Sequence, residues 1–368
     1  MSPTRVTPER VLLLGRGLGP GGMERLLVNQ VAFGDHGRFA YSVAYISPHK
    51  DQLVPELEAL GVPVHCVAQR GTWWPLSLRR LLREPGFDIV HVHSPLVASV
   101  IRVVSRLRRR RPRIVYTEHN SWGPYSVPTR WANRVTYRLD DAQIAVSNAA
   151  RSSVPVRLRG RLEVVDHGID LDAVRSHLAS RAEARARLGV GDDEVVVGTV
   201  ANLRPEKNYD GLLRVAGRIT TELPSVTFVS IGQGPLEEEI GALHARSGLG
   251  DRFRLMGHQV DAPSLMAGFD VFVLASHWEG LPVAFMEARA LGLPVVVTAV
   301  GGLVDHVCDG VDGLLVPPRD DDSLVAALRR VLTDEDLRVR MGRASAAAAE
   351  DFDARIAVGR IEQRYTSR

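Results

Sequence analysis

The chain has 368 residues, of which 45% are hydrophobic and 24% are charged, and its formal net charge is +3. This length predicts two domains, and the composition excludes disordered, collagen-like and repeat proteins. Cys66 and Cys308 are the only cysteines, which excludes a disulfide framework and a cysteine-rich zinc site and favours the cytoplasm. No export signal is visible, and no apolar run has the roughly 18 residues of a membrane span.

Charge is distributed unevenly along the chain. Residues 1–180 contain 25 lysines and arginines against 15 acidic residues, whereas residues 181–368 contain 21 against 28. Only Lys50 and Lys207 are lysines among the 46 basic residues. Because this sequence uses arginine almost everywhere else, a lysine at 207 indicates a need for a compact charge on a flexible stem, as in phosphate binding.

Short β-branched runs alternate with segments of helical period along both halves, which predicts an α/β fold with two doubly wound parallel sheets. We expect strands within 10–15, 41–47, 62–68, 88–94, 113–119, 143–147 and 161–165, and then, after a helical stretch over 171–188, within 195–200, 226–232, 252–257, 271–276, 294–299 and 313–318. These elements predict an N-terminal domain (1–168), a C-terminal domain (169–350) and a final helix (351–368) that packs back on the first domain.

Ligands of open parallel sheets bind beyond the carboxyl ends of the strands. After the first predicted strand, Gly17, Gly19 and Gly22 match the GxGxxG spacing, which lets backbone amides approach a phosphate. No carboxylate ends the second strand, which argues against nicotinamide dinucleotides. Two interpretations of the Gly-rich segment remain open. It is either a tight turn that allows close strand-to-helix packing or, as we favour, a contact for an anion or a sugar.

In the second half, Arg204 and Lys207 follow the first predicted strand, just before a helix. Two cations beside free helix amides suit a diphosphate, and a solvated basic turn is the alternative.

The segment SHWEGLPVAFME, residues 276–287, is the densest signal. Pro282 fits the first turn of a helix that would run to Leu291, so that Gly280 and Leu281 present its positive end to an anion. Glu279 and Glu287 are eight residues apart, about 12 Å along a helix, which suggests two clamps on a long ligand. A surface carboxylate is the alternative for Glu287.

His91 and His93 lie two residues apart on a predicted strand, so both side chains point to the same face. We expect His91 to be a core histidine and His93, near the strand end, to face a ligand. A zinc site that included His119 would need further ligands, and we expect no metal.

Five motifs occur in the order found in family 4 retaining glycosyltransferases, which the whole chain resembles: GPGGMER, PEKN, IGQGPL, EGLPVAFME and DGVDGLLVPPRD. The resemblance implies the GT-B fold, with two facing Rossmann-like domains and a cleft between them. It implies transfer of a sugar from a nucleotide diphosphate donor, bound by the C-terminal domain (169–350), to an acceptor bound by the N-terminal domain (1–168), without a metal or a protein-bound cofactor.

By the same resemblance, Arg204 and Lys207 would hold the donor diphosphate and Glu287 the ribose. Glu279, with the backbone of Gly280 and Leu281, would hold the transferred sugar and its phosphate. The substrate-binding set is completed by Gly21, Gly22 and His93 of the first domain, and His119 would face the donor sugar, so that His119 and Glu279 form the catalytic set.

Three positions depart from the family pattern. Asn202 replaces a frequent arginine, His167 replaces the usual asparagine before GID, and the segment VGGLVDHV lacks the usual Pro-Glu-Ile. They affect the expected contacts with phosphate and sugar, and leave the expected fold unchanged.

Six arginines form a basic block between residues 106 and 113. The block is either a solvated helix end or an electrostatic contact with anionic lipid. Binding of nucleic acid is disfavoured, because no interleaved aromatic residues accompany the block. Four aromatic residues in predicted loops could stack on an acceptor sugar or lipid, or could be buried: Trp73, Trp74, Trp122 and Tyr125.

The sequence thus predicts a cytoplasmic hexosyltransferase, with possible peripheral contact at the inner face of the membrane. Its acceptor would be a carbohydrate, a lipid-linked sugar or a small molecule, in cell-envelope glycan, glycolipid or secondary-metabolite synthesis. UDP is favoured over GDP as the donor nucleotide. A nucleotide-sugar epimerase on the same fold and a non-catalytic nucleotide-sugar-binding protein are the rival interpretations.

Overall fold

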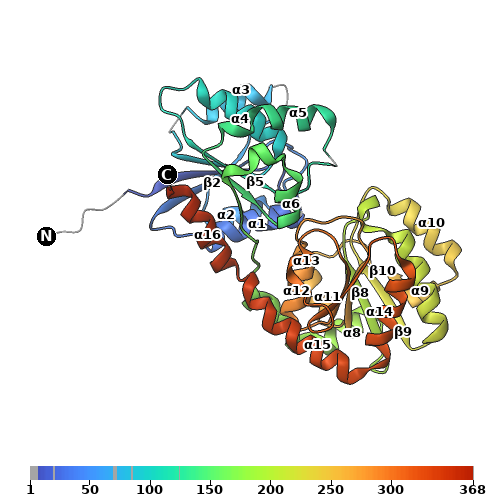
Figure 1. Ribbon diagram of the computed structural model, residues 1–368. Helices are drawn as coiled ribbons and strands as arrows, with labels where there is room; N and C mark the ends of the chain where they lie inside the picture. The colour runs from blue at the N-terminus through green and yellow to red at the C-terminus, as the bar shows by residue number, and fades with distance from the viewer. Residues whose placement is uncertain (1–6, 20, 69–72, 84–85, 124, 368) are drawn as a thin grey trace. The chain divides into compact units, whose positions relative to one another are not determined.

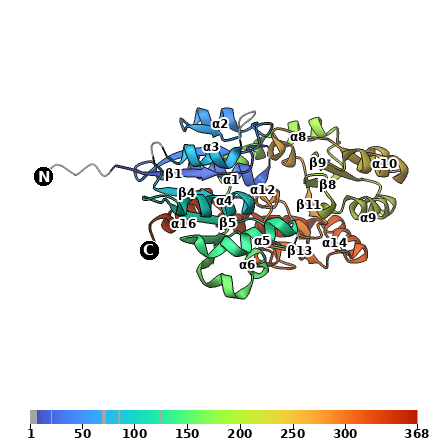
Figure 2. The ribbon, with the colours of Figure 1, turned by 90° about the horizontal axis from the view of Figure 1, so that it is seen from above.

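The computed structural model describes residues 7–19, 21–68, 73–83, 86–123 and 125–367. The chain divides into two compact units. The N-terminal unit contains Met1–Gly168 together with Ala354–Arg368, and the C-terminal unit contains Ile169–Asp353. Each unit is built around one parallel sheet, and each is described by itself below (Figures 1 and 2).

The N-terminal unit has a seven-stranded sheet in the order β3-β2-β1-β4-β5-β6-β7. Its strands are β1 (Glu9–Leu14), β2 (Phe39–Tyr45), β3 (Val64–Cys66), β4 (Ile89–Val92), β5 (Arg113–Glu118), β6 (Ala142–Ala145) and β7 (Leu162–Val164), and every adjacent pair is parallel. Each matches a strand predicted from the β-branched runs.

Helices cover both faces of this sheet, because alternate strand residues point to opposite sides and both sets are apolar. Leu12 and Leu14 of β1 pack with one helical layer, whereas Val11 and Leu13 pack with the other. The first layer contains α3 (Trp74–Leu81), α4 (Pro95–Arg106), α5 (Val127–Thr136) and α6 (Asn148–Ser153), and the second contains α1 (Gly22–Ala32), α2 (Val54–Ala59) and α16 (Ala354–Thr366).

The C-terminal unit repeats this plan with six parallel strands in the order β10-β9-β8-β11-β12-β13. They are β8 (Val195–Val200), β9 (Val226–Ile231), β10 (Phe253–Leu255), β11 (Val271–Leu274), β12 (Val295–Thr298) and β13 (Gly313–Val316). One face carries α7 (Leu171–Ser176), α8 (Arg181–Leu188), α11 (Ala262–Met266), α12 (Val283–Ala290) and α13 (Leu303–His306). The other face carries α9 (Tyr209–Glu222), α14 (Asp321–Thr333) and α15 (Glu335–Ala348), and α10 (Glu237–Ser247) packs beside α9.

Two predicted helices differ from those observed. The helical stretch expected over 171–188 is divided into α7, a 3-10 turn over His177–Ser180 and α8. The helix expected to run from Pro282 to Leu291 is α12, for which Pro282 is the N-cap and Leu291 the C-cap. Within the described residues, none of the helices is both long and apolar enough to cross a membrane.

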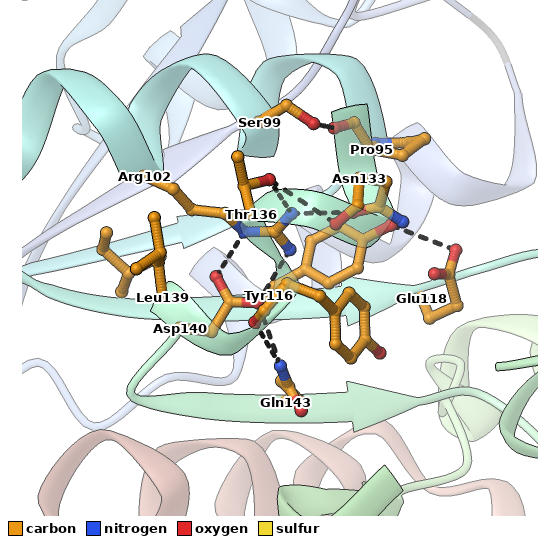
Figure 3. Close-up of polar contacts among 12 residues, drawn as sticks. Pro95, Ser99, Arg102, Tyr116, Glu118, Asn133, Thr136, Leu139, Asp140 and Gln143 are labelled. Carbon is orange, nitrogen blue, oxygen red and sulfur yellow. Dashed lines mark hydrogen bonds and ion pairs between the residues drawn. The ribbon is translucent and has the colours of Figure 1, made fainter. Parts of the chain in front are cut away.

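A buried ion pair connects the helical layer of the N-terminal unit to its sheet. Arg102 of α4 donates to both carboxylate oxygens of Asp140 at 2.7 Å, and both side chains are completely buried. The guanidinium also donates to Asn133 of α5 and lies over the ring of Tyr116 from β5, so it connects two helices and the sheet (Figure 3). The loss of one partner would leave an uncompensated charge in the core.

We therefore expect Arg102→Met to lower the free energy of unfolding by about 3–5 kcal/mol. Arg111→Met is the matched control, because Arg111 pairs with the neighbouring Asp141 at 2.8 Å and is 40% exposed. Exposed pairs contribute about 1 kcal/mol or less. Urea unfolding of both variants measures the difference, and equal losses would contradict a special role for the buried pair.

Candidate functional site

In both sheets the strand order reverses at one point, between β1 and β4 in the N-terminal unit and between β8 and β11 in the C-terminal unit. At such a point the loops after two neighbouring strands leave toward opposite faces and open a crevice. The Gly-rich segment follows β1 and His93 follows β4, whereas Lys207 follows β8 and Glu279 follows β11. Predicted site residues thus lie at the reversal point of each sheet.

Lys207 and Glu279 form an ion pair in the C-terminal unit. The Lys207 ammonium lies 2.5 Å from Oε1 of Glu279, and the Ser276 hydroxyl donates to the same oxygen at 2.6 Å. The side chains of Lys207 and Glu279 are only 16% and 8% exposed. An ammonium has three N–H donors, so this contact leaves donors for a phosphate.

Glycines bring the loops around this ion pair into close contact. A Cβ on Gly232 would lie 2.0 Å from the carbonyl oxygen of Ala201, and one on Gly301 would lie 2.3 Å from that of Glu279. Gly301 also has a positive φ of 58°. The motifs IGQGPL and VGG therefore allow the loops after β9 and β12 to pack on the loops that carry Lys207 and Glu279.

Asn208 fixes the direction of the segment that carries Lys207. Its φ is 53°, in the left-handed region that asparagine tolerates better than most residues. Its side chain accepts from the amide of Gly211 at the start of α9 and donates to the carbonyl of Ala275 at the end of β11. One residue thus caps a helix and connects the two central strands of the sheet.

The other predicted donor-site residues lie on the same group of loops. Gly280 accepts from the amide of Gly302 at 2.6 Å, and Leu281 is buried just before α12. Glu287 lies within α12, whereas Arg204 is exposed at the start of the segment that leads to Lys207.

One expectation about this site was wrong. Glu279 precedes α12, which begins at Val283, so the rise of a helix does not give the separation of Glu279 from Glu287.

Four histidines lie together in the N-terminal unit, from the ends of β4, β5 and β7. Nδ1 of His93 lies 3.0 Å from Nε2 of His119, and Nδ1 of His119 lies 3.2 Å from Nε2 of His167. The ring of His91 lies beside that of His93, with centroids 4.1 Å apart and the ring planes tilted by 39°. It bonds Thr117 at 2.7 Å and Tyr365 of α16 at 2.8 Å, which confirms it as a hydrogen-bonded core histidine.

The proton positions in this array are coupled. A neutral imidazole has one N–H, so His119 donates to one neighbour and accepts from the other. Burial lowers the pKa of His91 to about 3 and that of His167 to about 4, and it holds the pKa values of His93 and His119 well below their usual range. The array is therefore neutral at physiological pH. Nε2 of His93 is buried and has no hydrogen-bond partner among the described residues, so this nitrogen could bond a ligand hydroxyl.

The carboxyl group of Glu118, next to His119, is completely buried. It accepts from the indole of Trp122 at 2.6 Å and from the hydroxyls of Tyr125 and Tyr116 at 2.5 and 3.0 Å. Burial raises its pKa to about 7, against the effect of these donors. Apart from the clustered aromatic residues, no sequence pattern indicates this network.

The four aromatic residues for which acceptor stacking and burial both remained open have different environments. Trp122 is buried against Glu118, so it is not available to an acceptor. Tyr125 is partly buried in the same network, and Trp74 begins α3. Trp73 is 74% exposed.

Gly21 is the N-cap of α1 and Gly22 its first residue, so the predicted Gly-rich segment does lead into a helix start. Gly21 has ordinary extended φ and ψ angles.

No group of three or more His, Cys, Asp or Glu side chains suited to a metal ion occurs among the residues that the structure describes.

Comparison with known proteins matches both units to glycosyltransferases. Residues 11–173 match the Glycosyltransferase Family 4 model, and residues 180–347 match Glycosyl transferases group 1. A D-inositol 3-phosphate glycosyltransferase from Kribbella flavida is 31% identical over 74% of this chain and 69% of its own length. The chain belongs to glycosyltransferase family 4.

Two further proteins resemble this family 4 glycosyltransferase over most of its length. The UDP-Gal:alpha-D-GlcNAc-diphosphoundecaprenol alpha-1,3-galactosyltransferase of Escherichia coli is 29% identical over 79% of this chain and 78% of its own. The crystal structure of HepE from Anabaena in complex with UDP and glucose is 22% identical, with a TM-score of 0.86 over 97% of this chain and 99% of that one. This likeness confirms the GT-B fold.

We expect Lys207→Ala to weaken binding of nucleoside diphosphate about 10- to 100-fold, because a charge-assisted hydrogen bond contributes about 1.5–3 kcal/mol. Isothermal titration calorimetry measures this loss. The only other lysine, Lys50, is an exposed residue of the N-terminal unit, so Lys50→Ala is the matched control and should bind as the parent does. Unchanged affinity of the Lys207 variant would mean that Lys207 belongs to a solvated turn.

A second prediction concerns stability at acid pH. The unfolded chain protonates a histidine near pH 6.5, whereas folded His167 stays neutral down to about pH 4, so the folded state loses stability as the pH falls through this range. When the pH falls from about 7.5 to about 5, the free energy of unfolding of His167→Asn should therefore rise by about 2 kcal/mol relative to that of the parent.

Urea unfolding of parent and variant at the two pH values gives this double difference. His49→Asn, at an exposed histidine, is the control and should keep the pH dependence of the parent. A His167→Asn variant that follows the parent at both pH values would show that His167 is protonated in the folded state.

Proposed function

We propose that this family 4 enzyme is a retaining, metal-independent transferase that moves a hexose from a nucleotide diphosphate sugar to a hydroxyl acceptor, with UDP favoured over GDP. The ion pair of Lys207 with Glu279, beside the start of α12, is the observation that carries the proposal. It supplies a partly buried cation where the diphosphate of a donor would lie at the sheet reversal. The names of the galactosyltransferase and of the HepE complex, which mention UDP, support the choice of base.

The proposed reaction needs no bound cofactor and no protein nucleophile. The acceptor oxygen attacks the anomeric carbon from the side of the leaving group while the bond from that carbon to the phosphate oxygen breaks. The electron pair of this bond goes to the diphosphate, and the acceptor proton passes to a phosphate oxygen. Lys207, Arg204 and the amides before α12 stabilise the charge that develops on the diphosphate.

We assign the remaining site residues to the rest of the donor and to the acceptor. Glu287 binds the ribose, and Glu279 orients the sugar while it holds Lys207 in place. His119 faces the transferred sugar. Nε2 of His93 bonds a sugar or acceptor hydroxyl, because it is a buried nitrogen of the array that has no partner within the described part of the chain. Gly21 and Gly22 bring the start of α1 to the acceptor.

The proposed acceptors belong to cell-envelope glycan, glycolipid or secondary-metabolite synthesis. An acceptor carried on a lipid would place the enzyme at the cytoplasmic face of a membrane, in peripheral contact with anionic lipid.

A thermal-shift screen of UDP, GDP and their sugars identifies the donor, since a ligand at 100 times its Kd adds about 2.7 kcal/mol of stability. NMR of the product then gives the configuration of the new bond, and the reaction should proceed fully in EDTA. Inversion, or loss of activity in EDTA, would contradict the proposal. Isomerised donor formed without an acceptor would indicate an epimerase, and binding without turnover would indicate a binding protein.

The two glutamates should be separable by substitution. Glu287→Gln should weaken binding of the free nucleoside diphosphate, because it removes the carboxylate that accepts from the ribose. Glu279→Gln should mainly lower kcat for sugar transfer, with a smaller effect on the free diphosphate. Calorimetry and initial rates on both variants test this difference, and the same pattern of losses in both would contradict separate roles.

A further inference from the structure

Helix α5 of the N-terminal unit has polar side chains turned inward and apolar side chains turned outward. Asn133 is completely buried, where it accepts from Arg102. Val127, Trp131 and Val135, at spacings of four residues on the opposite side, are 68%, 67% and 60% exposed. A helix on an ordinary water-facing surface has the reverse arrangement.

The neighbouring 3-10 segment, Val156–Arg161, extends this apolar surface. Val156 is 77% exposed, and Arg138, just after α5, donates to the carbonyl of Arg157 at 3.1 Å, which holds the two segments together. A hollow of about 560 Å³ lies between them and is lined by Trp131, Arg134, Val135, Arg138, Arg157 and Leu158. We refer to α5, this segment and the hollow as the α5 face.

Charge on the α5 face has one sign. Residues 127–161 contain seven arginines and two aspartates, and both aspartates are paired with arginines from outside this stretch, Asp140 with Arg102 and Asp141 with Arg111. Some exposed arginines of the C-terminal unit pair with carboxylates, as Arg218 and Arg329 do. Among the described residues no carboxylate is paired with Arg130, Arg134 or Arg157.

Several arginines of the basic block at residues 106–113 make hydrogen bonds or ion pairs within the fold. Arg106 donates to the carbonyl of Leu139, Arg111 pairs with Asp141, and Arg113 donates to the carbonyls of Arg364 and Ser367. Half of the arginines in this block therefore bond within the fold. The α5 face is thus a stronger candidate for a lipid contact than the block.

We infer that the α5 face docks on the surface of an anionic phospholipid bilayer. Exposed tryptophan and valine side chains enter the boundary between headgroups and acyl chains, and the surrounding guanidinium groups bind lipid phosphates. The hollow is lined by three arginines and three apolar side chains, which suits a phosphate headgroup with the beginning of its chains. The inference deepens the proposed function, because it rests on an acceptor that is carried on a membrane.

Vesicle sedimentation tests the inference. The full chain should pellet with vesicles of equal parts phosphatidylglycerol and phosphatidylcholine, and should stay in the supernatant with pure phosphatidylcholine. Arg134→Gln with Arg157→Gln should lower partitioning on the order of twentyfold, since each basic residue near an anionic surface contributes about fivefold. Arg246→Gln with Arg343→Gln, two exposed arginines of the C-terminal unit, is the matched control and should partition as the parent does.

Tryptophan fluorescence tests whether the α5 face is the part of the protein that contacts the bilayer. Lipids with brominated acyl chains should quench the tryptophan emission of the parent, and Trp131→Phe should lose most of this quenching while Trp73→Phe keeps it. Lys207→Ala should pellet as the parent does, so failure of the donor site and failure of the α5 face are distinguishable. Negligible pelleting, or equal pelleting with neutral vesicles, would overturn the inference. So would a dimer in sedimentation velocity that Trp131→Ser dissociates, because a second copy would then cover this face.

Discussion

Parallel strands end at the same edge of a sheet, and a change of direction in the strand order is the only place where two neighbouring loops leave that edge toward opposite faces. This constraint determines where chemistry is possible in both units of the protein. The Gly-rich segment and His93 lie at one reversal, and Lys207 and Glu279 at the other. Residues that are 72 positions apart in the sequence thus form an ion pair, because β8 and β11 are neighbours. The helices and cores serve to hold these edges in place.

Much of the fold was predictable because both sheets are buried on two sides, so their strands are continuous runs of Val, Ile and Leu that stand out from helical patterns. The candidate donor site could be proposed from short local motifs, because PEKN contains Lys207 and EGLP contains Glu279. The direct contact between Lys207 and Glu279 was not foreseen, because it depends on the pairing of β8 with β11, which no local pattern encodes.

The histidine array and the Glu118 network show the limit of sequence reasoning more clearly. His91, His93, His119 and His167 come from three strand ends, and only the packed sheet brings their rings within hydrogen-bond distance. Likewise, Glu118 looks like any charged residue at a strand end, yet burial under Trp122 and Tyr125 changes its pKa. The outward apolar side of α5 was missed because its period resembles that of an ordinary amphipathic helix, and only the buried position of Asn133 tells which side faces the core.

The N-terminal unit is made from two stretches of chain separated by the whole C-terminal unit. Its last helix, α16, supplies Ile361 and Tyr365 to the core, and the Tyr365 hydroxyl bonds His91. A ribosome synthesises α16 only after all 185 residues of the intervening unit, Ile169–Asp353. The first sheet is therefore synthesised long before one of its helical layers is complete. A nascent chain that stalls before residue 354 has a complete C-terminal unit and an N-terminal unit that lacks its final helix.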